Sequence, residues 1–429
     1  MREMKDSGIS WIGMIPKDWK MLRTKNQYRS HKIIAGTDAE KYERLALTLD
    51  GVIKRSKEDS TGLQPDSFDG YQILQKGELV FKLIDLENLA TSRVGYSPFT
   101  GIVSPAYVIL HPIQDVNARF GEYYFLSLWQ RAIFNSLGDN GVRSNLNSGD
   151  LLNIPYPTPS LPEQERIVAF LDAKCTEIDT ILEKTRTSIE DYKKLKLSVI
   201  TEAVAKGIRG ERPMKDSGVE WIGEIPVEWS MPQLGWITSK IGSGYTPKGG
   251  AEVYVNEGIK FLRSQNVYFE GFSLDDVAYI TPEVDEEMSG TRVLKGDILF
   301  NITGGSIGRC RFVDENLGPA NVNQHVCIVR PAKISTKYLF YFLQSNAGQT
   351  QVDILQTGGN REGLSASAFK QFSVPLPAEF EQREIAEYLD EKCATIDSLI
   401  ASKEDLITEL ESYKKSIIYE YVTGKKEVL

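Results

Sequence analysis

The sequence predicts an α+β fold with two strand-rich domains and two long helices that pack together as a coiled coil. Three observations lead to this prediction. The chain has 429 residues, which is too long for a single hydrophobic core and indicates at least two domains. Two segments of the sequence each occur twice. Two stretches, 163–206 and 378–423, contain neither proline nor glycine, as is typical of long helices.

The repeated segments divide the chain into halves. "KDSGISWIGMIPKDW" (Lys5–Trp19) returns as "KDSGVEWIGEIPVEW" (Lys215–Trp229), an offset of 210. "EQERIVAFLDAKCTEIDTIL" (Glu163–Leu182) returns as "EQREIAEYLDEKCATIDSLI" (Glu381–Ile400), an offset of 218. Each half therefore has a repeated opening, a middle of its own and a repeated end. The middles, residues 25–140 and 235–358, share little sequence that can be aligned.

The repeated ends read as two helices of similar length. Pro162 suits a first helical turn, and Glu163 and Glu165 favour its positive end. Apolar residues recur at a spacing of three or four, which predicts a coiled-coil seam. They are Ile178, Ile181, Tyr192, Leu195 and Val199 in the first helix, and Ile396, Leu399, Leu406, Leu410, Tyr413 and Ile417 in the second. Thr185 and Lys403 interrupt this seam.

The middles read as mixed, strand-rich domains. Short apolar runs bounded by turn residues predict strands. The runs are "GELVFKLI", "YVILHP", "GDILFNIT" and "VCIVRP". We expect short helices around "EYYFLSLWQRAIFNSL" and "TKYLFYFLQSN".

Composition excludes several classes of protein. No apolar run approaches the roughly 20 residues of a membrane span, and the N-terminal residues lack a signal-peptide pattern, so we expect a cytoplasmic protein. Four widely spaced cysteines, with no CxxC pair and only three histidines, argue for reduced thiols and against a zinc site. The net charge of −9 does not favour nucleic-acid binding, although a local basic patch can still bind phosphate.

The order of these motifs carries a resemblance. A W-I-G-x-I-P-x-x-W opening, a variable domain, an xPxPxxxEQxxI segment and a long helix, followed by the same series again, resembles the specificity subunit of type I restriction–modification systems. "GIVSPAY" (Gly101–Tyr107) also looks like a stretch of that family's target-recognition domains. The resemblance covers essentially the whole chain.

The resemblance implies a function. Two target-recognition domains, related by a pseudo-twofold axis, would each read one half of a split site in double-stranded DNA. The helices would run antiparallel, act as a spacer and bind two methyltransferase subunits, which motor-nuclease subunits can join. The methyl group passes from S-adenosylmethionine to adenine N6 on the partners, so this subunit would do no chemistry and need no cofactor or metal.

The repeat also sets the expected domain boundaries. Residues 1–160 form the first recognition domain, 161–210 the first spacer helix, 211–377 the second recognition domain and 378–429 the second spacer helix. Acidic residues on the helices are candidates for partner binding: Glu177, Asp191, Glu404 and Asp405.

Several polar positions are candidates for DNA contact, each weighed against an ordinary solvated surface group. "KMLRTKNQYRSHK" (Lys20–Lys32) contains five basic residues and no acid, and includes Lys25, Arg29 and Lys32. "FLRSQNV" brings together Arg263, Gln265 and Asn266, side-chain types that pair with guanine and adenine edges. The other candidates lie in polar loops: Arg143, Asn145, Lys248, Asn360 and Arg361.

Other motifs have simpler explanations. Gly304–Gly308 fits the G-x-S-x-G nucleophile elbow, but a strand-like "RCRFV" follows it, so we expect a glycine-rich hairpin. Asp172-x-Lys174 and Asp390-x-Lys392 imitate part of a nuclease motif, but on helices they read as solvated charges. Trp11, Trp19, Trp221 and Trp229 read as wedges that pack the opening segments onto their domains.

A rival function belongs to another class. A coiled-coil scaffold with two globular protein- or carbohydrate-binding domains would suit the duplication and the acidity equally well. Only the family motifs speak against it. The acidity also suggests that the chain alone binds DNA weakly and depends on positive surface from its partners.

Overall fold

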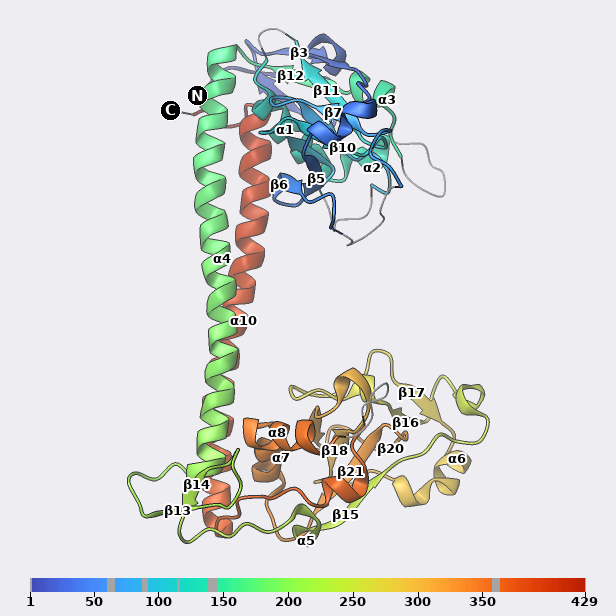
Figure 1. The fold of residues 1–429 in the computed structure, drawn as a ribbon, viewed down its shortest axis with the longest axis vertical. Coiled ribbons are helices and arrows are strands. Elements are labelled where there is room, and N and C mark those ends of the chain that lie inside the picture. The colour runs from blue at the N-terminus through green and yellow to red at the C-terminus, as the bar shows by residue number, and fades with distance from the viewer. Residues whose placement is uncertain are drawn as a thin grey trace. The chain divides into compact units, whose positions relative to one another are not determined.

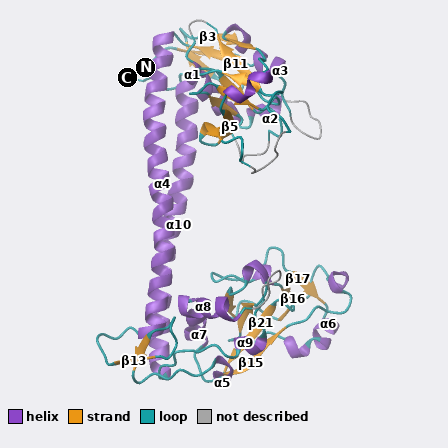
Figure 2. Ribbon diagram, viewed as in Figure 1, coloured by secondary structure: helices purple, strands orange, loops and turns teal. Residues whose placement is uncertain are grey.

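The computed structural model describes residues 2–59, 66–86, 92–113, 116–137, 145–356 and 363–428 (Figure 1). The chain forms two compact units. Unit 1 comprises Met1–Thr185 and Asp405–Leu429, and unit 2 comprises Arg186–Glu404. Each unit mixes helices and strands, as Figure 2 shows, which confirms the α+β class.

Within its described residues, unit 1 contains two four-stranded sheets and two small strand pairs. One sheet has the order β6 (Gly51–Arg55), β5 (Arg44–Thr48), β10 (Gly101–Val103), β7 (Gln72–Leu74). The other has the order β4 (Tyr28–Ser30), β11 (Val108–Pro112), β8 (Leu79–Phe81), β9 (Val94–Tyr96). The pairs are β1 (Met4–Asp6) with β2 (Met14–Pro16), and β3 (Lys20–Arg23) with β12 (Pro155–Thr158). The helices are α1 (Ala118–Gln130), α2 (Ile133–Leu137), α3 (Ser148–Asn153) and the start of α4 (Leu161–Lys206).

The core of unit 1 lies between α1 and the second sheet. Helix α1 begins at an N-cap, Asn117, whose side chain accepts hydrogen bonds from the backbone N–H groups of Arg119 and Phe120. Its buried Phe125 packs edge-on against Tyr28 of β4 and Phe81 of β8. Aromatic side chains of this kind contribute large buried areas, so they fix the helix on the sheet.

Unit 2 repeats this plan with different strands. One sheet has the order β15 (Thr238–Ser243), β21 (Val326–Pro331), β18 (Ile298–Asn301), β19 (Cys310–Phe312), and the other β17 (Ala278–Ile280), β16 (Ile259–Leu262), β20 (Ala320–Val322). A further pair joins β13 (Met214–Asp216) to β14 (Glu224–Pro226). The helices are α5 (Leu234–Ile237), α6 (Pro282–Glu287), α7 (Thr336–Gln344), α8 (Asn346–Leu355), α9 (Ala366–Phe369) and most of α10 (Glu379–Val422). The strands and short helices predicted from the apolar runs are confirmed.

The two middles share a β core that their sequences hide. In unit 1, β8 pairs antiparallel with β11 in the register Leu79↔Leu110. In unit 2, β18 pairs antiparallel with β21 in the register Ile298↔Val329, so each strand lies 219 residues after its counterpart. The lack of alignable sequence between the middles therefore does not mean a lack of shared structure.

Helices α4 and α10 run antiparallel in both units. In unit 1, Lys414 Nζ donates to Asp179 at 2.6 Å, and the Phe170 and Tyr421 rings lie 4.4 Å apart. In unit 2, Lys196 Nζ donates to Asp397 at 2.7 Å. Asp397 and Lys414 are the repeat counterparts of Asp179 and Lys196, so the same ion pair occurs twice with the helices exchanged.

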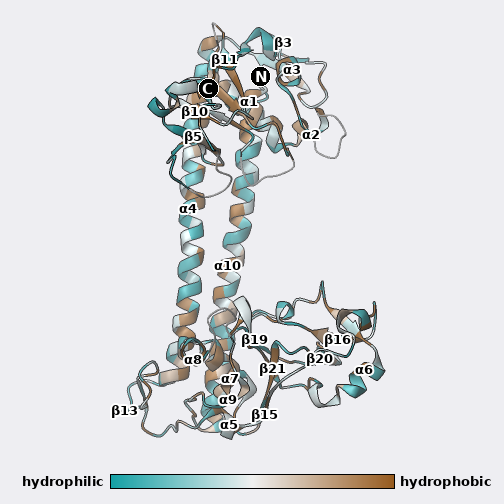
Figure 3. Cartoon of the chain, turned by 45° about the vertical axis from the view of Figure 1, so that its right-hand side comes forward, coloured by the Kyte–Doolittle hydropathy of each residue, from teal (hydrophilic) through white to brown (hydrophobic). Residues whose placement is uncertain are grey.

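The predicted seam is only partly buried. Ile178 and Ile417 are buried as expected. Thr185, predicted as an interruption, is also buried, and its hydroxyl is satisfied because it donates to the carbonyl of Ile181. Other seam residues are 39–52% exposed: Ile181, Leu195, Leu399, Leu406 and Tyr413. Figure 3 accordingly shows hydrophobic and hydrophilic residues mixed along both helices. A 3.6-residue period rotates a strict heptad stripe out of a two-helix contact, which explains the difference.

All four cysteines are free and buried, which agrees with packing roles for Cys175 and Cys393. Among the residues that the structure describes, no helix combines the length and hydrophobicity that a membrane span requires.

Candidate nucleic-acid interface

The basic segment Lys20–Lys32 lies on the surface of unit 1 along β3 and β4. Strand β3 is fixed by its pairing with β12, and Tyr28 of β4 is fully buried with its hydroxyl 3.3 Å from that of Tyr156. Lys25 and Arg29 are exposed, and neither forms an ion pair within the described ranges. Lys25 lies in the short turn between the two strands and Arg29 lies on β4, so both cations can contact phosphates without first losing a partner.

Lys32 and Asn145 are also exposed but already bonded. Lys32 Nζ donates to the carbonyl of Pro105 at 3.2 Å. Asn145 Oδ1 accepts a 3.2 Å hydrogen bond from the backbone N–H of Asp85, a residue with a left-handed φ of 53°. The candidates Arg143, Asn360 and Arg361 lie outside the described residues.

In unit 2, one turn of 3₁₀ helix, Ser264–Asn266, presents Arg263 and Gln265 together. Arg263 Nη2 donates to the carbonyl of Asp276 at 2.7 Å, and Gln265 Nε2 donates to the carboxylate of Asp276 at 2.8 Å. Asn266 is buried: its Oδ1 accepts from the N–H of Arg263 and its Nδ2 donates to the carbonyl of Ser273. Its amide therefore stabilises the turn that positions the other two side chains.

Unit 1 contains the same local turn. In Arg23–Asn26, Asn26 Oδ1 accepts from the N–H of Arg23 at 3.1 Å, and the middle of the turn presents Lys25. The shared pattern, R-[TS]-x-N, places one exposed side chain, Lys25 or Gln265, at the tip of each turn.

The exposed Lys248 belongs to a loop that contacts residues missed in the sequence. Gly244 lies so close to the backbone that a Cβ there would be 1.8 Å from the carbonyl oxygen of Val322. Thr246 Oγ1 donates to Gln324 Oε1 at 2.5 Å, and Gln324 Nε2 lies 3.1 Å from His325 Nε2. Gln324 and His325 thus lie beside the loop that carries Lys248, a contact that only the fold reveals.

A buried acid joins each opening segment to its long helix. In unit 1, Trp19 Nε1 donates to Glu163 Oε2 at 3.0 Å. Arg2 forms an ion pair with the same carboxylate, and this hydrogen bond raises the pKa of Arg2. In unit 2, the repeat counterparts Trp229 and Arg212 bind Glu381 at 2.9 and 2.6 Å.

Trp19 and Trp229 are each 1% exposed, so the expected packing role is confirmed for these two, whereas Trp221 is 38% exposed.

The glutamine that follows each of these two glutamates forms a second set of contacts between segments. Gln164 accepts from the N–H of Asn117 and donates to the carbonyl of Pro159. Gln382 accepts from the N–H of Ser335 and donates to the carbonyl of Pro377. The repeated Glu-Gln dipeptide therefore fixes the opening segment and the first turn of α1 or α7 to the start of the long helix.

Two aspartates expected to be solvated charges are instead paired. Tyr123 donates to Asp172 and Tyr341 donates to Asp390, both at 2.7 Å. Arg119 and Lys337 complete the pairs. Burial, with these hydrogen bonds, raises the pKa of both tyrosines. The pairs link α1 to α4 and α7 to α10. This structural role accounts for both aspartates, so they need no nuclease role.

The structure also supports the simpler explanation of the G-x-S-x-G segment. The short 3₁₀ turn Gly304–Ser306 precedes strand β19, not a helix. His325 Nδ1 lies 2.7 Å from Thr303 Oγ1, so the histidine is engaged by a residue other than Ser306.

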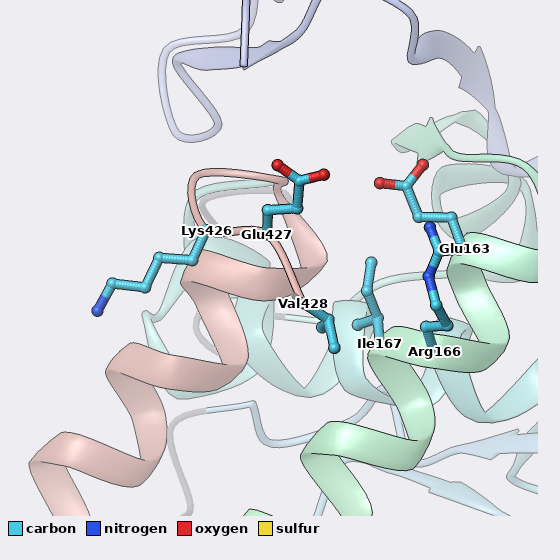
Figure 4. Close-up of a pocket in the computed structure, with 6 residues that line it drawn as sticks. All are labelled: Glu163, Arg166, Ile167, Lys426, Glu427 and Val428. Carbon is cyan, nitrogen blue, oxygen red and sulfur yellow. The ribbon is translucent and has the colours of Figure 1, made fainter. Parts of the chain in front are cut away.

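A small pocket in unit 1 shows where the end of the chain meets α4 (Figure 4). Its lining comes from Glu163, Arg166 and Ile167 of α4 and from Lys426, Glu427 and Val428 near the end of the chain. Nearby, Lys425 Nζ donates to the carbonyl of Ile12 at 2.7 Å. The pocket therefore marks a packing contact between the last described residues and the start of α4.

Comparison with known proteins gives a consistent result. The family described as "Type I restriction modification DNA specificity domain" matches residues 52–191 and 226–412. The type I restriction enzyme MjaVIII specificity subunit of Methanocaldococcus jannaschii is 27% identical over 336 residues, covering 76% of this chain and 75% of that protein. The EcoBI specificity subunit of Escherichia coli is 25% identical over 290 residues, covering 66% and 60%.

Two solved structures have a similar fold. A chain studied for complex assembly and conformational transition of the type I R-M system has a TM-score of 0.74 at 15% identity, covering 96% of this chain and 99% of that chain. The HsdS subunit from Thermoanaerobacter tengcongensis has a TM-score of 0.52 at 14% identity, covering 96% and 98%.

Proposed function

Because the chain belongs to the family of type I restriction–modification DNA specificity proteins, we propose that it is the non-catalytic sequence-reading subunit of a DNA methylation complex. Each of its two domains reads one half of a bipartite site in double-stranded DNA. The main support is that each half of the chain has the same junction and β core but different surface side chains. A constant scaffold with variable surfaces suits two readers of different sequences.

The two surfaces suit complementary tasks. Lys25, Arg29 and Lys32 contact phosphates and supply affinity, whereas Arg263 and Gln265 read base edges. Asp276 orients Arg263 and Gln265, but its negative charge repels the DNA phosphates. The two side chains therefore contact DNA only where base atoms replace Asp276 as their hydrogen-bond partner. With a net charge of −9, the chain relies on partner subunits for much of its DNA affinity.

Salt dependence of DNA binding tests the phosphate contacts. In the reconstituted complex, Arg29→Ala weakens binding for all sequences and makes the negative slope of log K against log salt about one unit less steep. Lys295→Ala removes an exposed cation elsewhere and leaves the slope unchanged. If the single alanine substitutions of Lys25, Arg29 and Lys32 all keep the wild-type slope, the basic segment does not contact DNA.

Exposed apolar residues on the long helices support two equivalent partner sites. Ile181 and Leu399 are repeat counterparts and are 39% and 42% exposed. Leu195 and Tyr413 are also counterparts and are 48% and 52% exposed. Unit 1 thus presents Ile181 and Tyr413, and unit 2 presents Leu195 and Leu399. Two matching apolar surfaces suit two copies of one partner, and we assign them to two methyltransferase subunits, which motor-nuclease subunits can join.

Stoichiometry tests this assignment. The double substitution Ile181→Glu with Tyr413→Glu reduces the complex from two methyltransferase subunits to one in native mass spectrometry, and Leu195→Glu with Leu399→Glu does the same. Leu49→Glu, at a 61% exposed position of unit 1, keeps both. Retention of both subunits by either double variant contradicts the assignment. The acidic positions Glu177 and Asp191 are paired with Lys174 and Lys194, so we expect them to contribute less.

The rival function, a coiled-coil scaffold with two protein- or carbohydrate-binding domains, is not favoured. The family match spans both halves, including most of each middle, where a scaffold would have unrelated domains.

A further inference from the structure

Two of the three histidines of the chain meet at one buried carboxylate in unit 1. Glu78, directly before β8, is 1% exposed. His31 Nε2 lies 3.4 Å and His111 Nδ1 3.2 Å from the same oxygen, Glu78 Oε1. One ligand atom from each of the three residues lies within 4.8 Å of the others, and no other such group occurs in the described parts of the chain. The other oxygen, Oε2, accepts from the N–H of Gln75 at 2.7 Å.

Unit 2 shows how the same position is neutralised in the other half. Asp297, directly before β18, is the structural counterpart of Glu78, and its Oδ2 accepts from the N–H of Leu294 at 2.7 Å. Arg330, the counterpart of His111, donates to both oxygens of Asp297 at 2.7 and 2.9 Å. Unit 2 therefore provides a permanent cation for its buried acid. Unit 1 provides two imidazoles there instead, and imidazoles are metal ligands.

The geometry suits a metal ion. Zinc with bonds of about 2.0–2.1 Å in a tetrahedron holds its ligand atoms about 3.3 Å apart, close to both nitrogen–oxygen distances. His31 and His111 have side chains that are 33% and 50% exposed, so they can rotate to complete the arrangement. Two histidines and one carboxylate favour a divalent transition metal over Mg²⁺ or Ca²⁺, and leave a position for water.

We propose that His31, Glu78 and His111 bind one divalent transition-metal ion, with Zn²⁺ as the probe. The ion supplies the positive charge that Arg330 supplies in unit 2, and it joins β4, β11 and β8 at the end of the basic segment. Arg29 is the cross-strand neighbour of His111, and its positive charge repels the metal ion. The affinity of this site for the ion is therefore lower than that of a structural zinc site. The site does not depend on the proposed DNA reading.

Zinc titration of the full-length, metal-free chain tests the proposal. Equilibrium dialysis with elemental analysis should give one Zn²⁺ per chain. At about 100 times the dissociation constant, zinc should raise the unfolding temperature by roughly 5–10 °C. His31→Ala should lower the zinc affinity at least about 100-fold. His325→Ala, which removes the histidine of unit 2, should bind zinc like the wild type.

A second variant separates loss of the site from loss of folding. His111→Arg copies unit 2, so it should lose zinc binding and its zinc-dependent stabilisation, yet unfold at or above the temperature of the metal-free wild type. The proposal is overturned if the wild type binds no stoichiometric zinc. It is equally overturned if His31→Ala or His111→Arg binds zinc as tightly as His325→Ala does.

Discussion

Single buried carboxylates determine how the segments of each unit meet. Glu163 and Glu381 accept hydrogen bonds from a tryptophan of the opening segment, and Glu78 and Asp297 occupy the turn before the central strand. The tryptophan–glutamate contact could have been inferred, because both partners lie in repeated segments that must meet in each half. The Glu78 cluster could not, because its residues lie in or directly beside three strands that are far apart in the sequence. The burial of Asn266 was not predicted, because the sequence of a polar loop does not show whether an amide contacts a base or stabilises a turn.

Removal of the tryptophan donor should destabilise the chain. Trp229→Phe keeps most of the ring but leaves the buried Glu381 with one donor fewer, so we expect a loss of about 1–3 kcal/mol in the free energy of unfolding. Trp236→Phe, at a 69% exposed position, should leave this free energy unchanged. Denaturant unfolding of both variants makes the comparison, and equal stability of the two would show that the indole hydrogen bond contributes nothing.

The Asp297–Arg330 pair should be more sensitive. Asp297 is fully buried, so Arg330→Met leaves an uncompensated charge and should cost about 3–5 kcal/mol in the same measurement. Lys295→Ala breaks an exposed pair with Glu315 and should change stability little. A small loss for Arg330→Met would mean that water or another cation already reaches Asp297.

At the scale of elements, the helices were predicted well and their contact less well. Absence of proline and glycine, acidic first turns and apolar spacing predict α4 and α10, because these signals are local. Burial along the seam depends on where the partner helix lies, and local spacing does not contain that information. The strands β8, β11, β18 and β21 were predicted from their apolar runs, but the correspondence between the two halves was missed because strands require apolar character and alternation, not particular residues.

The buried cysteines on these helices give a pH-dependent test. Burial raises the pKa of Cys393 to about 11 and also raises the pKa of Cys175. At pH 8 roughly one Cys393 thiol in a thousand is ionised, so alkylation in the native chain should be at least about 100-fold slower than in the unfolded chain. The rate should rise about tenfold per pH unit until the pH approaches 11. Peptide mass spectrometry measures the alkylation rate. Fast labelling of the native chain at pH 8 would show that the contact between the helices opens.

The same helices should not form a disulfide. Lys414 of α10 lies beside Cys175, and Lys196 of α4 lies beside Cys393, as antiparallel packing requires. A disulfide needs Cα atoms within about 7 Å, so oxidation should not join Cys175 to Cys393. Detection of that bridge within one chain would indicate parallel helices.

At the scale of the whole molecule, the duplicated order of motifs predicted the fold class and the family, because a repeat is visible without knowledge of any contact. The DNA-contact residues stay a prediction, because they lie on the variable surfaces, which the repeat does not constrain.

The helices should measure the distance between the two half-sites. Four residues inserted after Leu182 lengthen α4 by about 6 Å and rotate the part of the helix beyond the insertion by about 40° more than a full turn. DNA rises about 3.4 Å and turns roughly 35° per base pair. Rotation should dominate, because a misrotated domain faces away from the groove. We expect half-sites one base pair further apart, with two as the limit, when the methylated sites of the variant are mapped. Unchanged spacing at full activity would show that the helices do not set it.

The most direct test of the central claim exchanges one reader. Residues 25–140 are replaced by the corresponding middle of another family member, with Trp19, Glu163 and both long helices retained so that the junction can form. Methylation-aware sequencing of cells that express this chimera with its methyltransferase subunits reads the modified sites. We predict that one half of the methylated site changes while the other half and the spacing stay the same. A change in both halves, or in neither half at full methylation, would contradict the account of two independent DNA readers.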